Sequence, residues 1–128
     1  MTDRNSRQRV DQFIVDEIDS VPHLEALLIL WNSRPKQWSV EELSGFLYVP
    51  REVTQIILAE LSHRNLISAQ PGASETYFCD PPSEETQKLL RDVDRTYRKE
   101  LVRVSQMIHS KASAAVRDFA RAFRFKKD

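Results

Sequence analysis

The C-terminal third of the chain constrains the fold most, because residues 83–125 contain neither proline nor glycine. Apolar side chains recur along this segment at steps of three and four residues, which is typical of an amphipathic helix. A continuous helix of this length extends roughly 60 Å at about 1.5 Å per residue, so a small domain cannot cover it. We therefore expect a dimerisation helix over residues 83–128. The residues expected at its interface are Leu90, Val93, Tyr97, Leu101, Val104, Ile108 and Phe119.

The composition excludes several classes of protein. The chain has 128 residues, enough for one domain with a real core. It has 2 glycines and 1 cysteine, which argues against a phosphate-binding glycine loop and excludes an intrachain disulfide or a cysteine-rich zinc site. The sequence has no apolar run of membrane-spanning length and no secretory leader, so we expect a cytoplasmic protein without membrane insertion.

The charges are balanced overall but are divided unevenly along the chain. Residues 1–82 hold 7 basic and 12 acidic residues, a net charge of −5, and residues 83–128 hold 12 basic and 7 acidic residues, a net charge of +5. Such asymmetry indicates an anionic partner for the basic half, or pairing between the halves within a chain or across a dimer. In the second case the acidic partner is the helix expected over residues 10–19.

The segment before the dimerisation helix is expected to hold four elements and a hairpin. Residues 1–9 are expected to be a disordered arm, followed by a short helix that completes a first region over residues 1–20. Ser20 is expected to cap a helix that ends before Pro35. A capping box at Ser39 opens the next helix, and Pro50 opens another whose buried face is Val53, Ile57 and Leu61. Segments 66–70 and 76–79 are expected to pair as a β-hairpin.

The order helix, helix, turn, helix and hairpin resembles a winged helix-turn-helix domain, over about residues 21–79. The stretch VPREVTQIILAELSHRNLI is similar to the second helix and first wing strand of bacterial winged-helix regulators. The flanking helices resemble the dimerisation elements of MarR-like, PadR-like or BlaI-like repressors. The resemblance implies a mainly α fold with a small hairpin wing in a domain over residues 21–82. It also implies a homodimeric transcription regulator that binds specific sequences of double-stranded DNA.

In such a domain the second helix enters the major groove with its N-terminal residues. We expect Arg51 to pair with guanine, Gln55 with adenine, and Thr54 to meet a phosphate or a thymine methyl group. Ser39, Arg64 and three arginines of the N-terminal arm are expected nearer to phosphates. The candidate DNA-contacting residues are Ser39, Arg51, Glu52, Thr54, Gln55 and Arg64.

The charge of the middle segment leaves other functions open. Residues 36–82 hold 3 basic and 6 acidic residues, and the wing sequence PGASE has no basic residue. Because phosphate neutralisation supplies most non-specific DNA affinity, the main alternative is a winged-helix adaptor that binds another protein. The tail RDFARAFRFKKD leaves a third class, a membrane-surface or nucleoid-associated protein.

The sequence contains no motif of an enzyme, a metal site or a cofactor site. No nucleophile elbow, P-loop or HExxH pattern occurs, so we expect no enzymatic activity and no cofactor. The three histidines lack metal-ligand spacing with one another or with Cys79. Cys79, at the end of an expected wing strand, is expected to be buried and inert.

Overall fold

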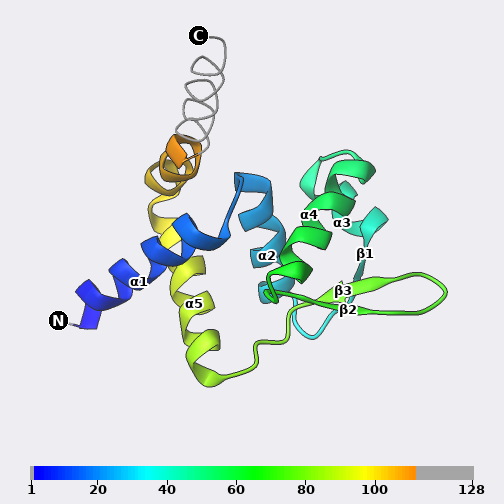
Figure 1. Ribbon diagram of the computed structural model, residues 1–128, viewed down its shortest axis with the longest axis horizontal. Coiled ribbons are helices and arrows are strands. Elements are labelled where there is room, and N and C mark those ends of the chain that lie inside the picture. Colours follow the sequence, from blue (N-terminus) through cyan, green and yellow to red (C-terminus); the bar gives the residue numbers. More distant parts are fainter. Residues whose placement is uncertain (1, 112–128) are drawn as a thin grey trace, which may run out of the picture.

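The fold is described from a computed structural model, which defines residues 2–111, with side chains from Asn5 onward. Helices flank a compact central group that carries a small antiparallel sheet (Figure 1). After α5, residues 101–111 form a further helix, called the 101–111 helix here. The labelled elements are α1 (Thr2–Glu17), α2 (Val21–Asn32), β1 (Trp38–Ser39), α3 (Val40–Leu47), α4 (Arg51–His63), β2 (Ser68–Gln70), β3 (Thr76–Phe78) and α5 (Glu84–Lys99).

Helix starts in the described chain follow from side-chain caps. Ser20 and Ser83 accept hydrogen bonds from the backbone amides of His23 and Thr86, at the starts of α2 and α5. Ser39 and Glu42 form the complete capping box at the start of α3. These three cap predictions are confirmed, because each hydroxyl satisfies an amide that has no partner within its helix.

The sheet has the order β1-β3-β2, with both pairs antiparallel. The hairpin β2–β3 is the predicted wing, and its loop projects away from the helices (Figure 1). Trp38 pairs with Tyr77, which makes β1 a third strand that the sequence pattern did not indicate. Two residues are too few for an alternating pattern to be recognised.

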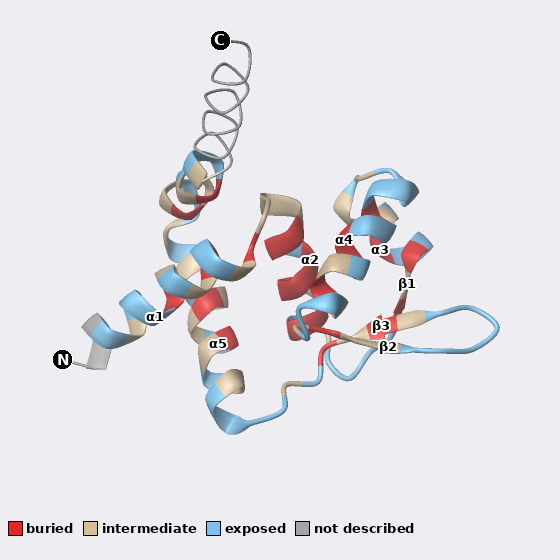
Figure 2. Cartoon of the chain, in the orientation of Figure 1, coloured by how far each residue is buried: buried red, intermediate tan, exposed pale blue. Residues whose placement is uncertain are grey.

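The core is centred on α2, which is buried on most of its surface (Figure 2). Leu24, Leu27 and Leu30 of α2 are fully buried and belong to one apolar cluster with residues from every other helix and from the sheet. A helix that is apolar nearly all round must be covered on all sides. The winged domain and the flanking helices therefore share one core.

The N-terminal residues do not form the expected disordered arm. Helix α1 starts at Thr2 and packs on α5, burying Val10 and Ile14. Arg7 pairs with Glu100 at 3.1 Å and Arg9 with Glu85 at 3.5 Å. Both arginines are therefore paired with the C-terminal part of the chain and do not lie on a free arm, and their role in DNA binding stays a prediction. The side chain of Arg4 lies outside the described residues.

The expected continuous C-terminal helix is interrupted at Glu100, which has φ −128° and ψ 48°. The 101–111 helix then begins, with the Val104 amide donating to the Glu100 carbonyl at 3.0 Å. No helix in the described part of the chain is long and apolar enough to cross a membrane.

The apolar stripe of this region is mostly used within the chain. Leu90, Val93, Val104 and Ile108 are at most 2% exposed, so the prediction that they contact a second copy is wrong. They belong to the same buried cluster as Val10 and Ile14 of α1 and the apolar residues of α2. Tyr97 is half-buried against the core, Leu101 is exposed, and Phe119 lies outside the described residues.

Candidate nucleic-acid interface

The turn between α3 and α4 is fixed by local hydrogen bonds. Tyr48 ends α3 in the left-handed conformation, with φ 56°. The Ser44 hydroxyl donates to the Val49 carbonyl at 2.6 Å, and the Val49 amide donates to the Ser44 carbonyl at 3.3 Å. Pro50 then stands at the N-cap of α4. This hydrogen-bonded turn holds α4 at a fixed angle to α3, as a helix-turn-helix requires.

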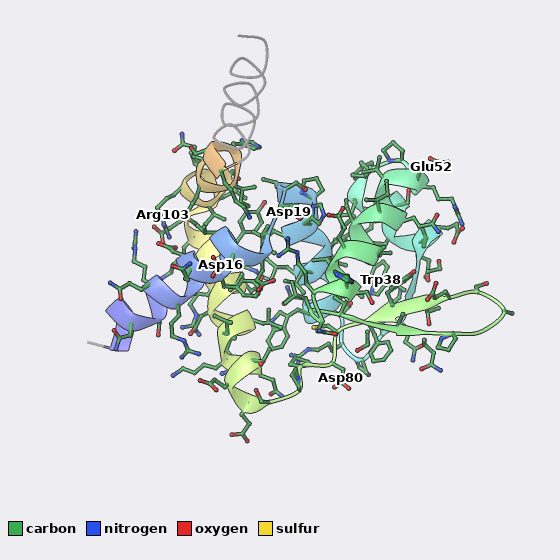
Figure 3. All side chains as sticks on the ribbon, in the orientation of Figure 1. Asp16, Asp19, Trp38, Glu52, Asp80 and Arg103 are labelled. Carbon is green, nitrogen blue, oxygen red and sulfur yellow. The ribbon has the colours of Figure 1, made fainter. Side chains whose placement is uncertain are left out.

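The outward face of α4 carries three of the predicted DNA-contacting residues. Arg51, Glu52 and Gln55 are exposed at its N-terminal end, and Figure 3 shows Glu52 at the outer end of the helix, across the view from Arg103. Ser39 is half-buried at the start of α3, where its hydroxyl oxygen is engaged in the capping box. The turn that ends α3 and the first residues of α4 lie together in one exposed region.

The prediction that Thr54 faces outward is wrong. Thr54 is 0% exposed, and its hydroxyl donates to the Pro50 carbonyl at 3.1 Å. The buried face of α4 is Thr54, Ile57, Leu58 and Leu61, while Val53 is 43% exposed. A threonine can occupy the inner face because its hydroxyl bonds to the preceding turn of the helix.

Arg64 is also not directed as expected. It follows α4 at the end opposite Arg51, and its guanidinium donates to the Asp16 carbonyl at 2.9 Å and to Glu17 at 3.2 Å. It also lies 3.4 Å from Asp19. Three acceptors on and after α1 therefore hold Arg64 at the end of α4 opposite Arg51, and its contact with a phosphate stays a prediction.

Arg51 is engaged in an exposed ion pair. Its Nε lies 2.7 Å from Glu41 Oε1, and its Nη1 donates to Gln55 Oε1 at 3.3 Å. The hydrogen bond from Arg51 lowers the pKa of Glu41, and the same bond raises the pKa of Arg51. Two of the candidate base-reading side chains are thus already bonded to each other before any ligand arrives.

Each basic residue between positions 36 and 82 lies close to a carboxylate. Lys36 lies 3.5 Å from Glu42, in addition to the pairs that Arg51 and Arg64 make. Lys36 also lies 4.1 Å above the ring of Trp38. The excess of acidic residues in this segment therefore goes together with a carboxylate close to each basic side chain.

Apolar side chains occupy the rest of this face. Phe46 is 61% exposed, Tyr48 is 94% exposed and Ile56 is 58% exposed. The sequence analysis did not single out these three residues as part of an interface. They add an apolar component to the candidate interface.

Cys79 is buried, and burial raises the pKa of its thiol to about 11. A thiol with such a pKa is almost entirely protonated at neutral pH and reacts slowly, because the thiolate is the nucleophile. The expected burial of Cys79 is confirmed.

The helix-turn-helix and three-stranded wing define a winged-helix domain with an added helix before it and further helices after it. No protein-family model and no curated protein matches the sequence. Among solved structures, the chain is similar to MepR of Staphylococcus aureus in its DNA complex, with 12% identity, 96% of this chain and 95% of that chain covered, and a TM-score of 0.56.

Two further structures show the same likeness. A MarR family protein from Bacillus stearothermophilus is 15% identical; the alignment covers 98% of this chain and 87% of that protein, with a TM-score of 0.53. RV1404 from Mycobacterium tuberculosis is 22% identical; the alignment covers 96% of this chain and 82% of that protein, with a TM-score of 0.54. The chain has the winged-helix fold of MarR-type proteins, which confirms the fold predicted from the sequence.

Proposed function

We propose that the chain is a non-enzymatic transcription regulator that acts as a homodimer and binds specific sequences of double-stranded DNA. The observation that carries the proposal is the outward face of α4, whose N-terminal residues Arg51, Glu52 and Gln55 are exposed. In helix-turn-helix proteins these positions meet base edges in the major groove. With Thr54 buried, the exposed Val53 and Ile56 become the candidates for contact with thymine methyl groups.

The structural neighbours support this function. MepR was solved with DNA, and another of its structures is described as that of a transcription regulator of a multidrug efflux pump. This chain aligns with MepR over nearly all of both chains. A winged domain flanked by helices in this way can therefore bind DNA, as MepR does.

Self-association is supported by apolar side chains on the outside of the C-terminal region. Leu101 is 53% exposed and Val102 is 65% exposed at the start of the 101–111 helix. Exposed apolar surface of this kind is stabilised when a second copy covers it. In a dimer the two α4 helices would read half-sites about 34 Å apart.

The second candidate function, a protein-binding adaptor, is favoured by a different observation. Phe46, Tyr48 and Ile56 are exposed on a surface whose two basic residues, Lys36 and Arg51, are paired with carboxylates. An apolar surface with little free positive charge suits a protein partner better than a phosphate backbone.

Selection of the full-length protein against a random duplex library tests the proposal, followed by affinity measurements on the recovered sites over a range of salt concentrations. We expect a palindromic consensus and a slope of log affinity against log salt that indicates several neutralised phosphates, at about −0.9 per phosphate. Absence of duplex binding at low salt, together with a stoichiometric protein partner, would instead establish the adaptor.

The dimer is tested separately by sedimentation of Leu101→Glu and Val102→Glu variants. We expect each charge to convert the dimer to a monomer, because it would be buried without a partner. An unchanged sedimentation coefficient would place the interface elsewhere. Gln106→Glu, at an exposed position on the same helix, is the matched control for the added charge.

A further inference from the structure

The fold brings together three side chains that the sequence does not associate. Asp19 lies in the link between α1 and α2, His23 in the first turn of α2, and Glu60 in the last turn of α4. One ligand atom from each lies within 4.8 Å of the others. Figure 3 marks Asp19 at this junction, between α1 and the winged domain. The spacing of the histidines along the sequence gave no sign of a metal site, because the residues that the fold brings together here are far apart in the sequence.

His23 has the orientation of a metal ligand. Its side chain is 10% exposed, and its Nδ1 lies 2.6 Å from the Ser20 hydroxyl oxygen. The same oxygen accepts the His23 amide at 3.3 Å. In the tautomer whose Nδ1 donates to this oxygen, Nε2 carries the lone pair that a metal ion requires. Ligating histidines are commonly held in this way by a hydrogen bond to the other ring nitrogen.

The free nitrogen of His23 faces carboxylate oxygen. Within the described residues Nε2 is buried and has no hydrogen-bond partner, and Glu60 Oε1 lies 3.5 Å away. A lone pair beside a carboxylate is an unfavourable arrangement unless a proton or a cation lies between them. The 3.5 Å separation of His23 Nε2 and Glu60 Oε1 is compatible with two ligands of one small positive ion.

We propose that Asp19, His23 and Glu60 form a binding site for a divalent first-row transition metal ion, with zinc as the representative probe. One imidazole nitrogen and two carboxylate oxygens provide three of four ligands, and water completes the shell. The imidazole favours such an ion over magnesium or calcium, which prefer oxygen ligands alone.

Two protein cations compete for Asp19. Arg64 lies 3.4 Å from Asp19, and Lys111 Nζ lies 3.7 Å from Asp19 Oδ1. Lys111 also donates to the Ile18 carbonyl at 3.1 Å, which ties the 101–111 helix, at the last residue that the structure describes, to the link after α1. A bound ion would replace the ammonium group at Asp19, so metal binding and this helix contact are in competition.

Zinc titration of the metal-free, full-length protein in the presence of a chromophoric chelator tests the site. We expect one zinc ion per chain, and affinity at least about tenfold lower in His23→Gln and in Glu60→Gln. His63→Gln is the matched control, since His63 is an exposed histidine at the end of the same helix as Glu60. We expect it to bind like the parent protein.

Lys111→Met gives a result of opposite sign. Removing the competing ammonium should tighten zinc binding by about two- to fivefold, the range expected for an exposed ion pair. Circular dichroism on every variant confirms that the fold is retained. The proposal is overturned if the parent protein binds no zinc, or if His63→Gln weakens binding as much as His23→Gln. Because no DNA is used, this result is independent of the proposed regulator function.

Discussion

Two regions of the molecule use charge in different ways. The helical layer, formed by α1, α5 and the 101–111 helix, is joined by ion pairs between distant parts of the sequence. Arg103 pairs with Asp11 at 3.1 Å, and Lys111 with Asp19 at 3.7 Å. The reading head, formed by α3, α4 and the hairpin β2–β3, pairs Arg51 with Glu41 only ten positions away. In the helical layer, ion pairs connect helices that are far apart in the sequence, whereas in the reading head the ion pair forms between neighbouring helices and neutralises the exposed surface.

This comparison answers part of the question raised by the uneven charge of the sequence. Arg103 and Lys111 of the basic half pair within the chain with Asp11 and Asp19 of the acidic half. The basic tail over residues 117–128, which was the candidate partner of the acidic helix, lies outside the described residues. Arg103 and Lys111 are therefore not free for an anionic partner. What the head offers a ligand is mainly shape, hydrogen bonds and apolar surface.

The largest expected effect breaks the helical layer. Ile108→Ala removes a side chain that is 1% exposed and should lower the free energy of unfolding by about 2–5 kcal/mol. Leu101→Ala on the same helix is the control, because a 53% exposed leucine should cost far less in a monomer. Urea unfolding below the dimer dissociation concentration measures both. Equal losses would mean that the layer is not closed within one chain.

The next effect concerns the reading head. Arg51→Ala should weaken specific DNA binding by roughly 5- to 150-fold and relax selection at one base position. Arg64→Ala removes the same charge near the other end of α4, where it is held by the link after α1, and should weaken binding much less. Affinities on the selected site decide between them. A larger loss for Arg64→Ala would contradict the assignment of the interface.

Thr54→Val tests the orientation of α4. It removes the hydroxyl that donates to the Pro50 carbonyl, and we expect a stability loss of about 0.5–1.5 kcal/mol. Base preference should not change, because Thr54 is 0% exposed. Gln55→Ala is the comparison, with the reverse expectation of altered preference at unchanged stability. A changed consensus for Thr54→Val would show that the hydroxyl reaches DNA.

The smallest expected effect removes the self-neutralisation of the head. Glu41→Gln frees Arg51 and should raise DNA affinity about two- to fivefold, with a steeper salt dependence. Because the pKa of Glu41 is lowered, the parent pair persists at neutral pH and weakens only as the pH falls through that lowered value. Glu75→Gln on the wing removes a charge without releasing an arginine. Equal gains from both variants would show that overall charge alone matters.

Much of the fold was predictable from local signals. The capping serines, the stop before Pro35 and the left-handed Asn65, with φ 62°, are each encoded within a few residues. The full length of α1 was not predictable, because its polar first turns are held by Arg7 and Arg9 pairing with residues far along the chain. Isolated sequence patterns contain no information about such contacts.

The candidate site was predictable only in part. Exposure of Arg51, Glu52 and Gln55 followed from the expected helix, but the buried face was displaced by one residue at Val53 and Thr54. Val53 lies four residues before Ile57 and Thr54 lies four residues before Leu58, so both fit a helical face and periodicity cannot separate them. The cluster of Asp19, His23 and Glu60 depends on the packing of α2 against α4, which no local pattern specifies.

The interruption at Glu100 has a consequence for how this chain can tolerate changes in length. In an unbroken helix, inserting one residue rotates everything downstream by about 100°, which would turn a buried stripe toward solvent. At Glu100 the ladder of backbone hydrogen bonds is broken and restarted, so the rotational phase of the 101–111 helix is set by its own contacts with α1. Insertions or deletions at this joint should therefore be accommodated more readily than those a turn away on either side.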